Sequence, residues 1–95
     1  MTEARFSAFD AADHIKTAED AALYLDAVLA DGDASEIAEA LGVLARSKGM
    51  AVIAKDSGLS RETLYRTLSE AGNPRLETLL GILRAMGLRL SVAAA

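Results

Sequence analysis

Apolar residues within residues 17–48 recur every three or four positions, which is the spacing of one face of an α-helix. The two stripes predict helices over about 18–30 and 34–47. The first stripe consists of Ala21, Ala22, Leu25, Val28 and Leu29, and the second of Ile37, Ala40, Leu41, Leu44 and Ala45.

Residues suited to helix capping precede both stripes. The hydroxyl of Thr17 can cap the amides of a first turn in which Glu19 and Asp20 suit the helix dipole. Asp33, followed three positions later by Glu36, is a capping-box pattern. Gly32 lies between the stripes, where we expect it to stop the first helix in a left-handed conformation.

The next two segments, GMAVIAKDSG and LSRETLYRTLSEAGNP, predict two short helices joined by a tight turn. Ala54 is small enough for the second helix to cross the first closely, and Gly58 tolerates the left-handed φ that the turn needs. Ser60 is placed to cap the second helix, and Leu64 and Leu68 lie four apart on its buried face. This spacing predicts a helix-turn-helix over residues 49–70.

The C-terminal part predicts one more helix and a short strand. Pro74 prevents the second helix from continuing, and an apolar stripe then predicts a helix over residues 75–87 that ends at Gly87. Gly81 and Ala85 face either a closely packed helix or solvent. The alternation after Gly87 predicts a strand over 88–93, whose exposed edge is a candidate for pairing with a second copy through Leu88, Leu90 and Val92.

Composition narrows the fold to a single all-α domain. The chain of 95 residues has two tyrosines, two phenylalanines, no tryptophan and no cysteine. Its abundance of alanine and leucine favours helices and excludes an all-β fold, and the lack of cysteine excludes disulfides and thiol chemistry. The N-terminus resembles no signal peptide, so we expect a cytoplasmic protein whose residues 1–16 form a partly packed arm.

Charge is divided between the two halves of the chain. Residues 1–45 contain two basic and ten acidic residues, whereas residues 46–95 contain eight basic and four acidic ones. The net charge of −4 therefore hides an acidic half at −8 and a basic half at +4. Such asymmetry indicates that the two halves bind different partners, although solvated helix faces would also produce it.

The outward residues of the second short helix suit the reading of DNA. Arg61 and Arg66 can donate two hydrogen bonds to guanine, although Arg66 could instead contact phosphate. Glu62 can accept a hydrogen bond from cytosine, and Tyr65 can contact a thymine methyl group or a phosphate. The candidates for phosphate contacts are Lys48, Lys55, Ser60, Ser69, Asn73 and Arg75.

Residues 50–92 resemble the Cro/Xre-like helix-turn-helix of phage repressors, chiefly in IAKDSGLSRETLYRTLS, GNPRLETLL and MGLRLSV. More narrowly, the chain is similar to HigA-type antitoxins, the probable addiction-module antidote proteins, and this similarity extends upstream through FDAADHIKTAEDAALYLDAVLADGD. The resemblance implies a five-helix-type domain that neutralises a small RelE/ParE-like toxin and represses its own operon as a homodimer. At Thr67 the chain departs from the repressor pattern, which usually has an apolar residue there.

The acidic half is the candidate surface for a basic toxin, because opposite charges steer and orient two proteins. An apolar anchor could come from Phe6, Phe9 or Tyr24, although Tyr24 could equally be a core residue. The acidic candidates are Asp20, Asp26, Asp31, Asp33 and Glu36.

Other functions receive less support from the residues. His14 is the only histidine, and neither a glycine-rich phosphate loop nor a metal motif is present, so we expect no enzyme, cofactor or metal. Asp31, Asp33 and Ser35 begin like a calcium loop, but the required glycine is replaced by Glu36. Two alternatives stay open: a stand-alone repressor without a toxin, and a protein-interaction module in which the helix pair is scaffold.

Overall fold

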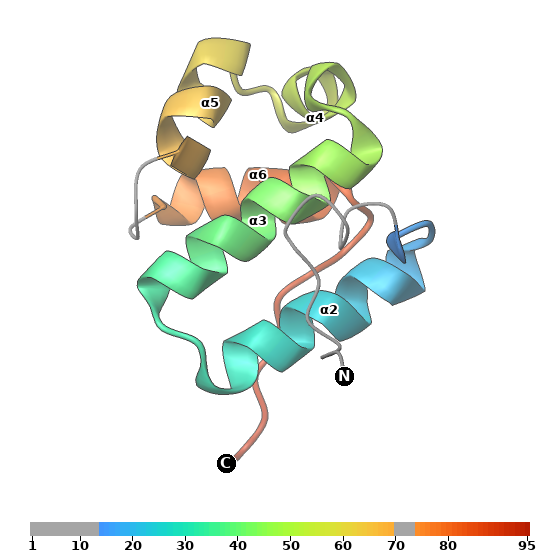
Figure 1. Ribbon diagram of the computed structural model, residues 1–95, viewed down its shortest axis with the longest axis vertical. Coiled ribbons are helices and arrows are strands. Elements are labelled where there is room, and N and C mark those ends of the chain that lie inside the picture. The colour runs from blue at the N-terminus through green and yellow to red at the C-terminus, as the bar shows by residue number, and fades with distance from the viewer. Residues whose placement is uncertain (1–13, 70–73) are drawn as a thin grey trace, which may run out of the picture.

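A computed structural model describes residues 14–69 and 74–95, apart from the side chain of Ser69. The candidates Phe6, Phe9 and Asn73 lie outside the described residues. Within the described part the chain forms five helices and no strand, which confirms the all-α prediction (Figure 1). The helices are α2 (Ala18–Asp31), α3 (Ala34–Lys48), α4 (Met50–Ser57), α5 (Arg61–Ser69) and α6 (Leu76–Ala85).

Two capping boxes start the first two of these helices. The amide of Asp20 donates to the hydroxyl of Thr17 at 3.0 Å, and the carboxylate of Asp20 accepts from the amide of Thr17 at 3.2 Å. Asp33 and Glu36 exchange the same pair of hydrogen bonds, each 2.9 Å long. The helix starts at 18 and 34 are therefore confirmed, because side chains satisfy amides that have no carbonyl partner within the helix.

Gly32 ends α2 in an extended conformation, with φ −79° and ψ 151°, and the predicted left-handed stop is wrong. Its amide donates to the carbonyl of Val28 at 2.7 Å. A Cβ at position 32 would lie 2.5 Å from that same oxygen, so close approach of the two backbones, rather than a positive φ, calls for glycine here.

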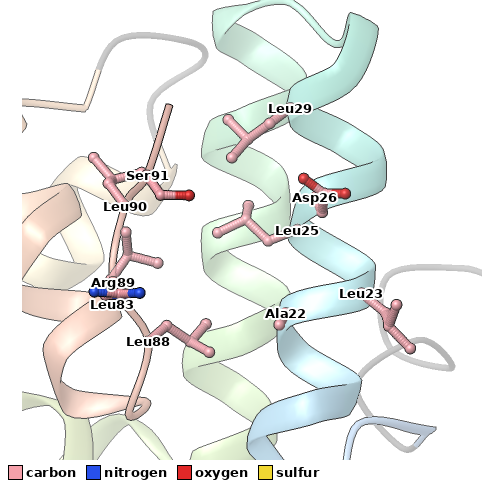
Figure 2. Close-up of a pocket in the computed structure, with 10 residues that line it drawn as sticks. All are labelled: Ala22, Leu23, Leu25, Asp26, Leu29, Leu83, Leu88, Arg89, Leu90 and Ser91. Carbon is pink, nitrogen blue, oxygen red and sulfur yellow. The ribbon is translucent and has the colours of Figure 1, made fainter. Parts of the chain in front are cut away.

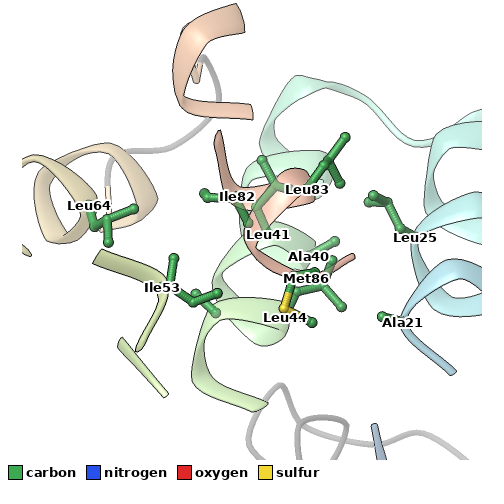
Figure 3. Packing of buried hydrophobic residues seen from close by; sticks show 11 residues of the cluster. Ala21, Leu25, Ala40, Leu41, Leu44, Ile53, Leu64, Ile82, Leu83 and Met86 are labelled. Carbon is green, nitrogen blue, oxygen red and sulfur yellow. The ribbon is translucent and has the colours of Figure 1, made fainter. Parts of the chain in front are cut away.

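Helix α3 lies at the centre of the fold and contacts each of the other four helices. Figure 3 shows the core extending from Leu64 on α5, past Leu41 and Leu44 on α3, to Leu25 on α2. Ile53 of α4 packs into the same cluster, which Ile82, Leu83 and Met86 complete from the C-terminal side. One continuous core therefore joins the acidic half of the chain to the basic half.

Glycine allows a close approach at α6, where Gly81 is buried. A Cβ at this position would lie 3.4 Å from both the Ser57 Cβ and the Leu59 Cδ1 atoms. Of the two orientations that the sequence left open, the structure has Gly81 facing a closely packed neighbour, namely the end of α4 and the turn after it.

Helix α6 ends at Ala85 with Met86 as its C-cap, two residues before the predicted end at 87, and Gly87 follows with φ 77°. The amide of Leu88 donates to the carbonyl of Leu83 at 2.8 Å and that of Gly87 to Arg84 at 3.1 Å, which is the Schellman arrangement. The predicted strand over 88–93 is wrong, because residues 88–95 have no regular structure. A strand needs a second backbone beside it, and the described part of this chain places none there.

None of the helices in the described segments has the length and apolar content needed to cross a lipid bilayer.

Candidate nucleic-acid interface

Helices α4 and α5 form a pair joined by a turn of three residues, at the end of the molecule away from α2 (Figure 1). Gly58 ends α4 in the left-handed conformation, with φ 79° and ψ 5°, as the sequence predicts. The amide of Thr63 donates to the hydroxyl of Ser60 at 3.0 Å, so Ser60 caps α5. The turn is therefore held by one glycine conformation and one capping hydroxyl.

The inner face of the pair is anchored in the core. Ile53 and Leu64 are fully buried, and Ala54, Leu59 and Leu68 pack against the same cluster. Thr67, the residue that departs from the repressor pattern, is only half-buried, so its hydroxyl-bearing side chain is not fully enclosed in the core. With Leu64 facing inward, α5 has a fixed orientation and presents its opposite face to solvent.

That outer face carries all four residues predicted to read bases. The side chains of Arg61, Glu62, Tyr65 and Arg66 are exposed, with Tyr65 51% accessible. All four lie within six consecutive residues of α5, so a single short helix presents them on one face. Guanidinium donors, a carboxylate acceptor and a phenol are the groups that read base edges in a major groove.

The predicted phosphate contacts are spread around this helix pair. Lys48 ends α3, Lys55 lies in the last turn of α4, and Arg75 precedes α6, and all three side chains are exposed. Within the described part of the chain none of the three makes an ion pair or a side-chain hydrogen bond. The hydroxyl of Ser60 is engaged in capping and also donates to the Thr63 hydroxyl at 2.8 Å.

The acidic candidates fall into two groups. Asp20, Asp33 and Glu36 accept capping hydrogen bonds, which assigns these carboxylates a role in the fold itself. The amide of Lys16 also donates to Asp20 at 3.0 Å, and this bond is the main reason that the pKa of Asp20 is lowered. Asp26 and Asp31 are exposed and accept no hydrogen bond within the described residues.

Tyr24 lies on α2, half-buried against the core. Burial is the main cause of its raised pKa, and the nearby negative charge of Glu39 adds to it. The structure therefore favours the core role that the sequence left open for Tyr24.

Sequence reasoning missed one feature, a groove between α2 and the C-terminal tail that is lined mainly by leucine side chains (Figure 2). The sequence contains one clue to this groove, because Leu23 is an apolar residue outside the predicted buried stripe of α2. In the structure its side chain is largely exposed. Among the described residues, no group of three histidine, cysteine, aspartate or glutamate side chains is placed to hold a metal ion.

These features define a small all-helical protein with an exposed, basic helix pair at one end and an acidic helix at the other. Residues 5–94 match the family model described as "Probable addiction module antidote protein". The chain belongs to this family.

A relative from Haemophilus influenzae is 40% identical over 92 residues, which cover 97% of this chain and 94% of the relative. That relative is described as "Uncharacterized protein". No solved structure matches the chain.

Proposed function

We propose that this protein is the antitoxin of a type II toxin-antitoxin module, which neutralises a RelE/ParE-like toxin by direct binding and represses its own operon as a homodimer. Family membership supports the antidote role. The DNA-binding role rests chiefly on one observation: the exposed face of α5, presented by a helix pair with a three-residue turn.

This helix pair has the features of a helix-turn-helix. Its first helix has the small residue Ala54 packed against the core, its turn has a left-handed glycine, and its second helix is anchored by the buried Leu64. In such motifs the second helix lies in the major groove and its exposed side chains contact base edges. Arg61 and Arg66 are therefore the proposed base-reading residues.

The exposed cations support the same role. Each phosphate contacted by a lysine or arginine adds affinity for any DNA sequence and positions the protein on the duplex. Lys48, Lys55 and Arg75 are proposed to make these contacts, because they lie within or next to the helix pair and form no ion pair within the described part of the chain.

The DNA-binding proposal is tested by titrating the protein onto a labelled fragment of its own promoter. Replacing Arg61 and Arg66 together by alanine should weaken binding by at least about thirtyfold, since each good base contact contributes roughly 1–3 kcal/mol. Arg84→Ala, which removes an exposed cation from α6, is the matched control and should bind almost as tightly as the wild type. Undiminished binding by the double variant would refute the assignment.

The toxin-binding proposal rests on the acidic side of the molecule. Residues 14–45 contain seven acidic residues and only Lys16 as a basic one. A basic toxin would be drawn to this side and held there by complementary charge. Asp31 and Glu39 are exposed and take no part in the capping boxes, so they are available to a partner.

Reversing these two charges tests the toxin-binding role. The candidate toxin is a basic protein encoded next to this gene, co-expressed with the full-length antitoxin. Asp31→Lys with Glu39→Lys should weaken the complex by about tenfold or more. The control is Asp56→Lys with Glu77→Lys, which makes the same change in total charge in the basic half and should leave growth rescue intact. An equal loss of toxin binding in both double variants would refute the proposal.

A further inference from the structure

The groove between α2 and the C-terminal tail has a volume of about 320 Å³ and is open to solvent (Figure 2). Its apolar surface comes from two regions that are far apart in the chain, namely α2 and the C-terminal part formed by α6 and the tail. They contribute Leu25 and Leu29 from α2, Leu83 from α6, and Leu88 and Leu90 from the tail.

The tail beside this groove exposes apolar side chains of its own. Leu90 is 41% and Val92 98% accessible. Within the described part of the chain, the backbone of residues 89–95 makes no hydrogen bond. The tail thus offers both apolar side chains and unpaired backbone groups, which an added protein surface could cover.

Two opposite charges face this groove. Asp26 lies on the α2 wall and Arg89 on the tail wall, and both are exposed (Figure 2). Neither forms an ion pair within the described part of the chain. The groove therefore carries one unpaired charge of each sign on opposite walls.

We propose that a second copy of this chain occupies the groove. In a two-fold interface every contact occurs twice: if one residue of the first copy touches a second residue of the other copy, the reverse contact is also made. One surface can therefore pair with itself if it is self-complementary. This surface meets that condition, because Asp26 of one copy can pair with Arg89 of the other in both directions. Leu90 and Val92 of each tail then pack against the leucines of the opposite groove.

The charges favour a second copy over a basic partner. The groove contributes one acidic and one basic side chain, so it has no net charge to attract a cation. The excess of acidic residues lies elsewhere on the N-terminal side, where it stays available to a toxin. In Figure 1 the tail runs past α2 to the end opposite α4 and α5, so this pairing leaves the exposed face of α5 uncovered.

This inference rests on the proposed function, in which a dimer binds a two-fold operator, but it is tested without DNA. The mass of the full chain is measured by light scattering and sedimentation equilibrium over a wide concentration range. The expected mass is twice that of the 9.9 kDa chain. Asp26→Arg and Arg89→Asp should each raise the dissociation constant by at least about tenfold, because each creates two like-charge contacts per dimer.

The double variant carrying both Asp26→Arg and Arg89→Asp restores opposite charges and should recover most of the affinity. Glu19→Arg is the control on α2 and Arg84→Asp the control on α6, since both side chains are exposed and lie outside the groove. Leu90→Asp should also weaken dimerisation. Circular dichroism checks that each variant keeps its helices.

Three results would overturn the inference: a wild-type monomer at every concentration, single charge variants that dimerise normally, or a double variant no better than the singles. A monomeric wild type whose groove is protected only when the basic toxin is added would assign the groove to the toxin instead. A dimer that fails to bind operator DNA would contradict the proposed function and leave the dimer surface standing.

Discussion

The acidic and basic ends of the molecule use their charged residues differently. At the acidic end, Asp20, Asp33 and Glu36 are engaged in capping boxes that start α2 and α3. At the basic end, α5 is capped by the neutral Ser60, and α4 follows Gly49 without a side-chain cap. Three carboxylates at the acidic end are thus part of helix caps, whereas Lys48, Lys55, Arg61 and Arg75 at the basic end take part in no cap.

This difference shows which charges are available for binding. Lys48, Lys55, Arg61 and Arg75 make no ion pair within the described part of the chain, so their replacement should cost little stability. The capping carboxylates cannot be changed without weakening a helix start. Charge substitutions at the basic end therefore report on binding, whereas those at the capping positions report on folding as well.

The largest expected effect is the salt dependence of DNA binding, which tests the role of the basic end. If two subunits together neutralise about six phosphates, affinity should fall roughly a thousandfold between about 50 and about 200 mM salt. Operator affinity measured across this range gives the slope, and Lys55→Ala should make it shallower. A response that does not change with salt would contradict phosphate contacts by the free cations.

The next largest effect concerns the core that joins the two ends. Leu64 on α5 is fully buried, so Leu64→Ala should lower the free energy of unfolding by about 2–5 kcal/mol. Leu76→Ala is the control, because this side chain is 64% exposed and its loss should cost less than about 0.5 kcal/mol. Urea denaturation followed by circular dichroism provides the measurement.

The same experiment asks whether the two ends unfold together. The chain has two tyrosines, Tyr24 on α2 and Tyr65 on α5. In a Tyr65→Phe background the tyrosine fluorescence therefore reports on α2, and in a Tyr24→Phe background it reports on α5. Since α3 contacts both helices, Leu64→Ala should shift both signals to the same midpoint. Separate midpoints would show that the ends are independent units.

A smaller effect is expected at the turn of the helix pair. Gly58 has φ 79°, and a Cβ there would have no atom within 4 Å, so the cost of Gly58→Ala is conformational. It should be about 1–2 kcal/mol. Gly42→Ala within α3 is the matched control and should stabilise the protein by roughly 0.5–1 kcal/mol, because alanine favours a helix. Thermal unfolding of both variants should give midpoint shifts of opposite sign.

Most of the fold could be predicted from the sequence because its signals are local. The helix starts at Ala18 and Ala34 follow from capping residues within three positions, and the turn at Gly58 follows from one glycine between two short apolar patterns. The exposure of Arg61 and Arg66 followed from the buried register of Leu64 on the same helix. Each of these signals is contained within one turn or one helix.

The failures arise where the outcome depends on distant parts of the chain. The alternation of Leu88, Leu90 and Val92 cannot tell whether a second strand lies beside it, and in this chain Leu88 packs against the core instead. Gly32 was correctly placed at the end of a helix, but its backbone angles depend on the contact with the Val28 carbonyl. The leucine groove escaped notice because its walls come from α2 and the tail, which the sequence does not show to be neighbours.

The smallest effect is the pH dependence of the cap at the acidic end. The amides of Lys16 and Thr17 donate to the carboxylate of Asp20 and lower its pKa below the ordinary 3.8. Because the folded pKa is the lower one, the carboxylate stabilises the protein above the unfolded pKa. That contribution is lost as the pH falls through the folded pKa.

Asp20→Asn should therefore be less stable than the wild type at neutral pH, and the two should converge in acid. Asp31→Asn is the control, because Asp31 accepts no hydrogen bond within the described residues and should show no comparable convergence. Chemical denaturation at several pH values measures both differences. A stability gap for Asp20→Asn that stays constant into acid would mean that the geometry of the cap, rather than the charge of its carboxylate, stabilises the start of α2.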